Sequence, residues 1–117
     1  MELVQNIYLG RDNVSNLKFT YVDGSGVQSD LNLSGLSSAA IIIHGGKNGA
    51  DVTANSANGV NMTWDSEGNF KAYLGDIDLD VGSYPATIIF FDTNHTDGQI
   101  VISRNGERKL TYRVIND

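Results

Sequence analysis

Residues 80–91 (Asp-Val-Gly-Ser-Tyr-Pro-Ala-Thr-Ile-Ile-Phe-Phe) decide the fold of this chain. Asp80, Gly82 and Tyr84 have the D-x-G-x-Y spacing of a corner at which a tyrosine ring is buried. The buried hydroxyl needs a hydrogen-bond partner, and the backbone just upstream, bent by Asp80 and Gly82, can supply it. The apolar run over residues 83–91 predicts a strand that leaves this corner and enters the core.

The segments on the N-terminal side of this corner also have the signature of strands. Residues 17–21, 30–33 and 61–64 place apolar side chains at alternate positions, which puts those side chains on one face of a sheet. Residues 37–44 include three consecutive isoleucines, a β-branched run that suits a strand buried on both faces. Residues 70–74 follow the turn residues Ser66-Glu67-Gly68 and predict a hairpin with residues 61–64.

Turn residues separate these strands. Residues 45–49 and 92–98 are polar and predict loops between strands. Asn105-Gly106 lies between the apolar segments 100–102 and 110–114, and Asn-Gly between two such runs is a strong signal for a β-hairpin. The chain contains 13 Gly, 12 Asn and 11 Asp among 117 residues, which leaves little room for long helices.

These patterns predict an all-β chain, specifically an immunoglobulin-like antiparallel β-sandwich of about eight or nine strands. The sandwich has no disulfide because the sequence contains no cysteine. Its length suits one domain over residues 1–117. Residues 1–10 alternate poorly and predict an N-terminal arm or an edge strand. Our hypothesis is that Glu2–Leu9 pairs with another chain.

The charge of the chain excludes several classes of partner. The formal net charge is −6, and the eight Lys and Arg are scattered. Nucleic acids require clustered cations, and anionic membranes repel a protein of this sign, so neither is an expected partner. The absence of cysteine removes disulfides, thiolate metal sites and cysteine nucleophiles together and fits synthesis in a reducing cytoplasm.

Acidic and imidazole side chains suggest a metal site only weakly. Asp76, Asp78 and Asp80 alternate with apolar residues and are the calcium candidates, but they lack the glycine and glutamate spacing of an EF-hand. The alternating pattern favours a strand or corner with the aspartates facing water over a calcium site. His44 and His95 lack further ligands at metal-binding spacing. No motif pairs a nucleophile with a base, so we expect neither a cofactor nor an enzyme.

Two further groups of residues are candidates for binding. Trp64, the only tryptophan, lies on an alternating strand, which favours a structural place in the core over stacking on a sugar. We expect the polar loops to face partner subunits through Lys47, Asn48, Asn94 and His95.

From about Asp12 to Ile115 the order of these features resembles the N-terminal domain of phage baseplate upper proteins. A D-G-x-x-x-D-L-x-G connection is approximated over residues 22–35, and an apolar strand follows at 39–43. The form N-G-V-x-x-x-W occurs at 58–64. The resemblance ends with a G-x-Y-x-A strand, a D-G turn and a closing strand at residues 82–86, 97–98 and 110–115.

The resemblance implies a non-enzymatic building block of a phage or prophage tail, made in the bacterial cytoplasm and located in the virion. Its partners would be other tail or baseplate subunits, and it would be a homo-oligomer in the assembly. The high Asn and Asp content and the segment Glu2–Gly10 depart from the family pattern. Two alternatives stay open: a carbohydrate- or cell-surface-binding module that uses Trp64, and a calcium-stabilised domain that uses the three aspartates.

Overall fold

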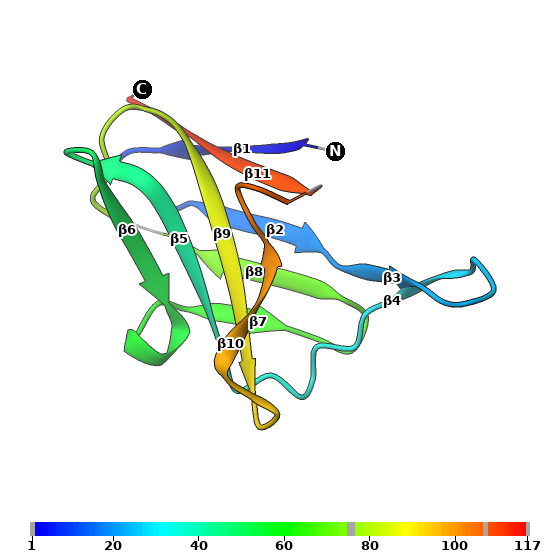
Figure 1. Ribbon diagram of the computed structural model, residues 1–117. Coiled ribbons are helices and arrows are strands. Elements are labelled where there is room, and N and C mark those ends of the chain that lie inside the picture. Colours follow the sequence, from blue (N-terminus) through cyan, green and yellow to red (C-terminus); the bar gives the residue numbers. More distant parts are fainter. Residues whose placement is uncertain (1, 75–76, 107, 117) are drawn as a thin grey trace.

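The computed structural model describes residues 2–74, 77–106 and 108–116, in which β-strands are the dominant element (Figure 1). One short 3₁₀ turn, η1 (Ser56–Asn58), joins two of the strands. The strands are β1 (Glu2–Tyr8), β2 (Val14–Lys18), β3 (Thr20–Val22), β4 (Gln28–Asp30), β5 (Ser38–Lys47), β6 (Ala50–Asn55), β7 (Met62–Trp64), β8 (Asn69–Tyr73), β9 (Gly82–Asp92), β10 (His95–Ile102) and β11 (Lys109–Ile115).

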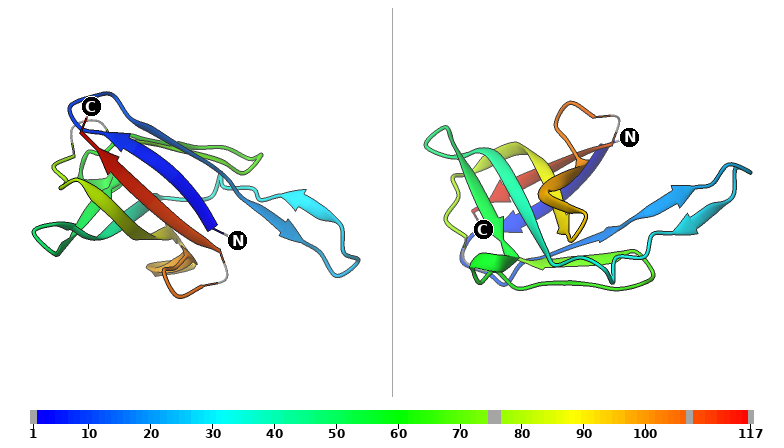
Figure 2. Two further views of the ribbon diagram at one scale, coloured as in Figure 1. Left: turned by 90° about the horizontal axis from the view of Figure 1, so that it is seen from above. Right: turned by 60° about the horizontal axis from the view of Figure 1, so that its bottom comes forward.

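The described residues form eleven strands, nine of which make up the two layers of a sandwich, as predicted. The larger sheet has the order β1-β11-β9-β5-β6, and β10 also pairs with β9. It packs over a three-stranded sheet of order β2-β8-β7, and the core lies between the two layers (Figure 2). Strands β3 and β4 form a separate two-stranded sheet that projects beyond the sandwich (Figure 1).

The N-terminal segment is an edge strand of the larger sheet. β1 pairs in parallel with β11, from Glu2 opposite Lys109 to Tyr8 opposite Ile115, while the other strand pairs among the described residues are antiparallel. Ile7 is 2% exposed and completes the core from this edge. The edge strand that the sequence predicts here is therefore present, with β11 of the same molecule on one side. Pairing of the other side of Glu2–Leu9 with another chain stays a hypothesis.

The last two strands do not form the predicted hairpin. β10 and β11 lie one after the other along the same edge of β9, with Ile102 opposite Ile88 and Leu110 opposite Ala86. Residues 103–106, which contain Asn105-Gly106, follow β10 as a turn. The Asn-Gly pair makes a local turn in this loop, where the Gly106 N–H donates to the Ser103 carbonyl at 3.0 Å. Both strands pair with β9 because this pairing buries Ile102 and Leu110.

Both predicted polar loops are shorter than expected. β5 continues through Lys47, so only Asn48 and Gly49 form the turn into β6, a strand that the sequence did not predict. Only Thr93 and Asn94 lie between β9 and β10, and the rest of the expected 92–98 loop is strand. The predicted hairpin of β7 and β8 is confirmed, with Trp64 opposite Phe70.

The core is built from the inward row of each strand. An aromatic cluster joins the layers, with Phe19 and Phe70 each at 5.1–5.3 Å (ring centroids) from Phe90. Such edge-on and tilted ring contacts add to the hydrophobic gain of burial. The largest fully buried side chains are Tyr112, Phe70, Ile41, Ile43, Ile88, Ile102, Leu110 and Val114.

Candidate functional site

The β3–β4 hairpin with its turn, residues 20–30, is the most exposed part of the described chain, and we call it the arm. β3 and β4 pair with each other, from Thr20 opposite Asp30 to Val22 opposite Gln28. They pack chiefly against one another and extend away from both layers of the sandwich (Figure 2). An isolated two-stranded hairpin is only marginally stable in water, so its attachment and its surface both need explanation.

One face of the arm continues the core-facing row of β2. Along this row Ser15 is 3% exposed, Leu17 6% and Phe19 4%, whereas the next inward position, Tyr21, is 48% exposed. Side chains alternate along a strand, so Tyr21 points to the same side as the buried residues before it. The arm therefore carries the inner surface of the sandwich past the point where the opposing sheet ends.

A second apolar residue shares this face of the arm. Val27, 57% exposed, lies opposite Asp23, whose N–H donates to the Val27 carbonyl at 3.1 Å. Asp23 is two residues from Tyr21, so Tyr21 and Val27 lie on the same side. We call this side the inner face of the arm. Val22, 67% exposed, lies on the opposite side, the outer face, together with Thr20 and Gln28.

Side-chain contacts fix the turn at the tip of the arm. Asp23 Oδ1 accepts the backbone N–H groups of Ser25 at 2.8 Å and Val27 at 3.1 Å. An aspartate that bonds its own backbone in this way pre-forms a tight turn. The tip is therefore ordered and presents a carboxylate next to the apolar residues of the inner face.

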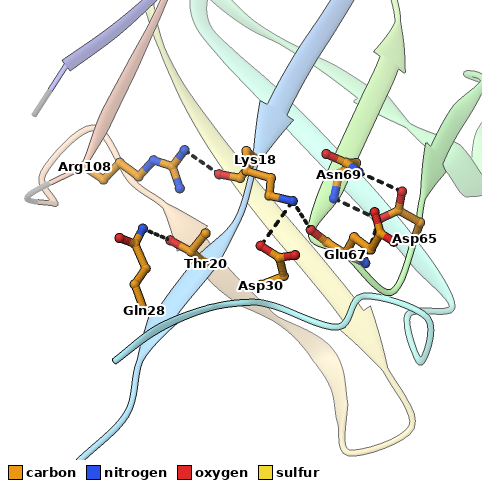
Figure 3. Close-up of polar contacts among 8 residues, drawn as sticks. All are labelled: Lys18, Thr20, Gln28, Asp30, Asp65, Glu67, Asn69 and Arg108. Atoms are coloured by element: carbon orange, nitrogen blue, oxygen red, sulfur yellow. Dashed lines mark hydrogen bonds and ion pairs between the residues drawn. The ribbon is translucent and has the colours of Figure 1, made fainter. Parts of the chain in front are cut away.

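Polar contacts hold the base of the arm on its outer side (Figure 3). Lys18 Nζ lies 3.2 Å from Asp30 Oδ1 and also donates to the Glu67 carbonyl. Gln28 Nε2 donates to Thr20 Oγ1 at 2.9 Å and joins the two strands. Nearby, the side-chain amide and backbone N–H of Asn69 hold the pKa of Asp65 below its usual value.

The base is anchored to the core on its inner side. Arg108, which directly precedes β11, lies with its guanidinium carbon 5.0 Å from the centre of the Phe19 ring, and its Nη2 donates to the Lys18 carbonyl at 2.9 Å. The Phe19 N–H donates to the Gly68 carbonyl at 2.8 Å. A Cβ on Gly68 would lie 2.1 Å from the Phe19 carbonyl oxygen, so the arm base and the β7–β8 turn touch through bare backbone. The arm thus projects from a rigid support.

The predicted tyrosine corner is present. Tyr84 Oη is 3.0 Å from the carbonyl oxygens of both Asp80 and Val81, within donating distance of either. A Cβ on Gly82 would lie 2.8 Å from Tyr84 Oη, which explains the glycine. The structural roles predicted for Asp80, Gly82 and Tyr84 follow from this geometry.

The calcium candidates beside the corner are engaged by protein groups. Lys47 Nζ lies 3.1 Å from Asp78 Oδ1 and 3.2 Å from Asp80 Oδ1. The Asn48 N–H donates to Asp80 Oδ2 at 2.7 Å, and this bond, followed by Lys47, lowers the pKa of Asp80. Asp76 lies outside the described residues, and the part of the chain that the structure describes contains no cluster of three metal-ligating side chains.

The four predicted partner residues do not lie together. Lys47 and Asn48 are at the β5–β6 turn, where they fasten this turn to the corner. Asn94 and His95 are at the β9–β10 turn at the opposite end of the sandwich (Figure 1). There Asp92 Oδ1 accepts the Asn94 N–H at 2.9 Å and lies 2.9 Å from His95 Nδ1. The hydrogen bond with His95 lowers the pKa of Asp92.

Trp64 is half-buried at the edge of the core. Its ring stacks on Phe70 at 6.2 Å between centroids with 8° between the planes, which is the structural role that the sequence favours. Its exposed part lines a shallow cavity of about 230 Å³ on the outer side of the small sheet. The cavity is lined by Trp64, Tyr73, Thr63, Asp65, Asn69 and Lys71.

One polar chain was not predicted by any sequence pattern. His44 Nε2 lies 2.7 Å from Thr87 Oγ1, and His44 Nδ1 lies 3.2 Å from Asp51 Oδ2. This corrects the expectation that no nucleophile meets a base, since the order hydroxyl–imidazole–carboxylate is that of hydrolases. Thr87 is only 7% exposed, which restricts access to its hydroxyl. The chain links three adjacent strands, a pairing visible only once the sheet is assembled.

Among the described residues, no helix has the length and apolar character required to span a bilayer. A scan against models of known protein families found no match to this chain, and a search of the curated proteins found no matching relative.

Proposed function

We propose that this chain is a non-enzymatic structural or adaptor module of a phage or prophage tail, at the baseplate, and that it acts through protein–protein contacts. The proposal combines the resemblance to baseplate upper proteins with one observation: the arm exposes Tyr21 and Val27 on a continuation of the core-facing row. The chain is made in the bacterial cytoplasm and functions in the virion.

The surface of the arm supports a role in docking. Keeping apolar side chains in water is unfavourable, and clustered exposed apolar residues commonly mark interaction sites. Lys18 and Arg108 fasten the base, so little conformational freedom is lost when a partner binds. A rigid projecting element with an apolar face suits a subunit that is held between others.

The charge of the chain narrows the class of partner. With a net charge of −6, the module binds neither nucleic acid nor anionic membrane. Its partners are other tail or baseplate subunits, including further copies of itself. The Thr87–His44–Asp51 chain is structural in this proposal, because it ties β6, β5 and β9 together.

Purified tail particles provide the test. Particles from a lysogen that carries the gene are separated on a density gradient, and their proteins are quantified by mass spectrometry. The proposal expects the chain to sediment with tail proteins at a constant ratio across the peak. A chain that stays with the unassembled proteins at the top of the gradient contradicts it.

A carbohydrate-binding function is the second candidate, and the shallow cavity beside Trp64 and Tyr73 favours it. An aromatic ring next to amide, carboxylate and ammonium groups can stack on a sugar and bond its hydroxyls. Tyr73 is 40% exposed, so Tyr73→Ala tests the site with less disturbance to the core than Trp64→Ala. Glycan-array binding that is lost in Tyr73→Ala and kept in Tyr21→Ala would favour this function over docking by the arm.

A further inference from the structure

We propose that the outer side of the small sheet binds an acidic oligosaccharide, which crosses strand β8 and places a carboxylate on Lys71. This inference rests on the second candidate function, because it names the class of ligand for the cavity beside Trp64 and Tyr73. It makes no use of the inner face of the arm.

Two hollows flank β8 on the outer side of the small sheet. The cavity beside Trp64, of about 230 Å³, is the β7-side hollow, and a second one of about 170 Å³ is the β2-side hollow. Asn69 and Lys71 line both of them, so the hollows adjoin along β8. Each is smaller than the ~300–1,000 Å³ of a typical ligand pocket, so a ligand that fills both makes the larger contact. The β2-side hollow is lined by Asn16, Leu17, Lys18, Asn69, Phe70 and Lys71.

A row of polar side chains crosses the sheet through both hollows. Lys71 of β8 lies opposite Asn16 of β2 on one side and Thr63 of β7 on the other. All three residues are exposed. Neighbouring strands lie ~4.8 Å apart, so the row spans ~10 Å. It therefore offers an amide, an ammonium and a hydroxyl group side by side, and these can bond the polar groups of two consecutive sugars.

An apolar pair lies next to this row. Tyr73 is on the same side of β8 as Lys71, two residues and ~7 Å away, and is opposite Val14 of β2. Tyr73 is 40% exposed and Val14 is 45% exposed. A tyrosine ring combines an apolar face with a polar hydroxyl. A sugar in the β7-side hollow can therefore stack on Tyr73 while its carboxylate bonds Lys71.

The charges on this side of the sheet favour an acidic ligand. Lys18 is engaged at the base of the arm, and Asp65 accepts the backbone N–H groups of Glu67 and Asn69 and the side-chain amide of Asn69 (Figure 3). Among the described residues, Lys71 forms no ion pair. Its ammonium group is therefore available to a ligand, and charge-assisted hydrogen bonds to a carboxylate are its strongest contacts.

The net charge of the chain makes this preference specific to one contact. With a net charge of −6, the chain as a whole repels anions. A preference for acidic over neutral sugars must then come from a local cation, and the replacement of Lys71 should abolish it. Lys109 is the matched control, because it is an exposed lysine on β11 of the larger sheet.

An array of oligosaccharides printed as pairs, each a uronic acid form and its neutral parent, tests the class of ligand. We expect the acidic member to bind roughly 10-fold more tightly, the contribution of one charge-assisted hydrogen bond. Lys71→Gln should reduce its affinity to that of the neutral member, and Lys109→Gln should leave it unchanged. Equal binding of acidic and neutral members by the wild type, or an equal loss in both variants, would overturn the proposal.

NMR titration tests whether the ligand crosses β8. The probes are the uronic acid disaccharide that binds most tightly on the array and its acidic monosaccharide. We expect Asn16→Ala to weaken the disaccharide several-fold and leave the monosaccharide unchanged, whereas Tyr73→Ala should weaken both. Thermal melting verifies that each variant folds. Unchanged disaccharide binding by Asn16→Ala would overturn the proposed crossing.

The outcomes separate this inference from the functions proposed above. Equal binding of acidic and neutral glycans that is lost in Tyr73→Ala overturns the acidic class and leaves the carbohydrate function intact. Absence of binding to every glycan on the array overturns both. Sedimentation with tail particles decides the tail function independently of either result.

Discussion

Replacement of Tyr112 by phenylalanine should destabilise the protein at neutral pH and stabilise it at alkaline pH. Tyr112 lies on β11 and is fully buried, with Oη 2.8 Å from Ser15 Oγ on β2. Ser15 in turn donates to Gln5 Oε1 on β1, so this polar chain crosses the core and joins the two layers. Burial raises the pKa of Tyr112 to about 12, while the Ser15 hydrogen bond acts in the opposite direction.

The magnitude follows from the pKa and the lost hydrogen bond. At pH 8 the substitution removes one buried hydrogen bond, which costs about 1 kcal/mol. Because the folded-state pKa is raised from 10.0, the stabilising effect of the neutral phenol is complete below pH 10 and is lost as the pH rises through about 12. By pH 12 the loss is about 2 kcal/mol. The variant should therefore be about 1 kcal/mol more stable than wild type at pH 12.

Urea unfolding followed by Trp64 fluorescence at pH 8, 10, 11 and 12 measures the free energy of unfolding of both proteins. It shows the pH above which Tyr112→Phe becomes more stable than wild type. The comparison between variant and wild type cancels the alkaline titration of other groups, such as Lys47, whose pKa is raised by Asp78 and Asp80. Ser15→Ala is the matched control, because it removes the same hydrogen bond but keeps the phenol. It should lose stability at pH 8 and keep the alkaline decline. Parallel pH profiles for wild type and Tyr112→Phe would refute the reasoning.

Four further predictions concern the corner, the arm base and the carboxylates. Gly82→Ala should destabilise the fold by at least about 2 kcal/mol in thermal melting, because its Cβ meets Tyr84 Oη at 2.8 Å, and the cost should fall in a Tyr84→Phe background. Gly68→Ala should cost more, at least about 3 kcal/mol, because its Cβ would meet backbone at 2.1 Å. Millimolar calcium against chelator should leave the melting temperature unchanged, since Lys47 occupies the carboxylates of Asp78 and Asp80. The pKa of Asp80 is lowered in the folded state. The stability that ionised Asp80 contributes is therefore complete above the ordinary carboxyl pKa and is lost as the pH falls through the folded-state pKa. Asp80→Asn should make the free energy of unfolding less dependent on pH in this acidic range.

Local patterns predicted the elements whose signals are themselves local. The D-x-G-x-Y spacing placed Tyr84 correctly because its partners lie three and four residues upstream. The hairpin of β7 and β8 was also predictable, since its turn and both alternating strands are contiguous in the sequence.

The sequence patterns did not predict the strand pairings between segments that are distant in the chain. Asn105-Gly106 predicted a hairpin, but the long strand β9 offered one edge to both β10 and β11, and burial of Ile102 and Leu110 outweighed the local turn signal. β1 pairs in parallel with the far end of the chain, which no periodicity can indicate. β6 was missed because its sequence is polar apart from its short inward row.

The sequence predicted the candidate site, the arm, only in part. Alternation over residues 17–21 correctly placed Leu17, Phe19 and Tyr21 on one face, but it gave no sign that the opposing sheet ends after Phe19. The exposure of Tyr21 depends on where another part of the chain stops. The contact of Thr87 with His44 is likewise a consequence of the register between β5 and β9.

Hydroxyl-radical footprinting tests most directly whether the inner face of the arm is a docking surface. Tyr21 and Tyr73 are matched reporters, at 48% and 40% exposed in the single chain, on the arm and on the outer side of the small sheet. The chain is labelled free in solution and within purified tail particles, and the oxidation of each tyrosine is quantified by mass spectrometry. Docking through the arm predicts that assembly protects Tyr21 several-fold and leaves Tyr73 unchanged. Equal oxidation of Tyr21 under both conditions, or protection of Tyr73 in its place, would contradict it.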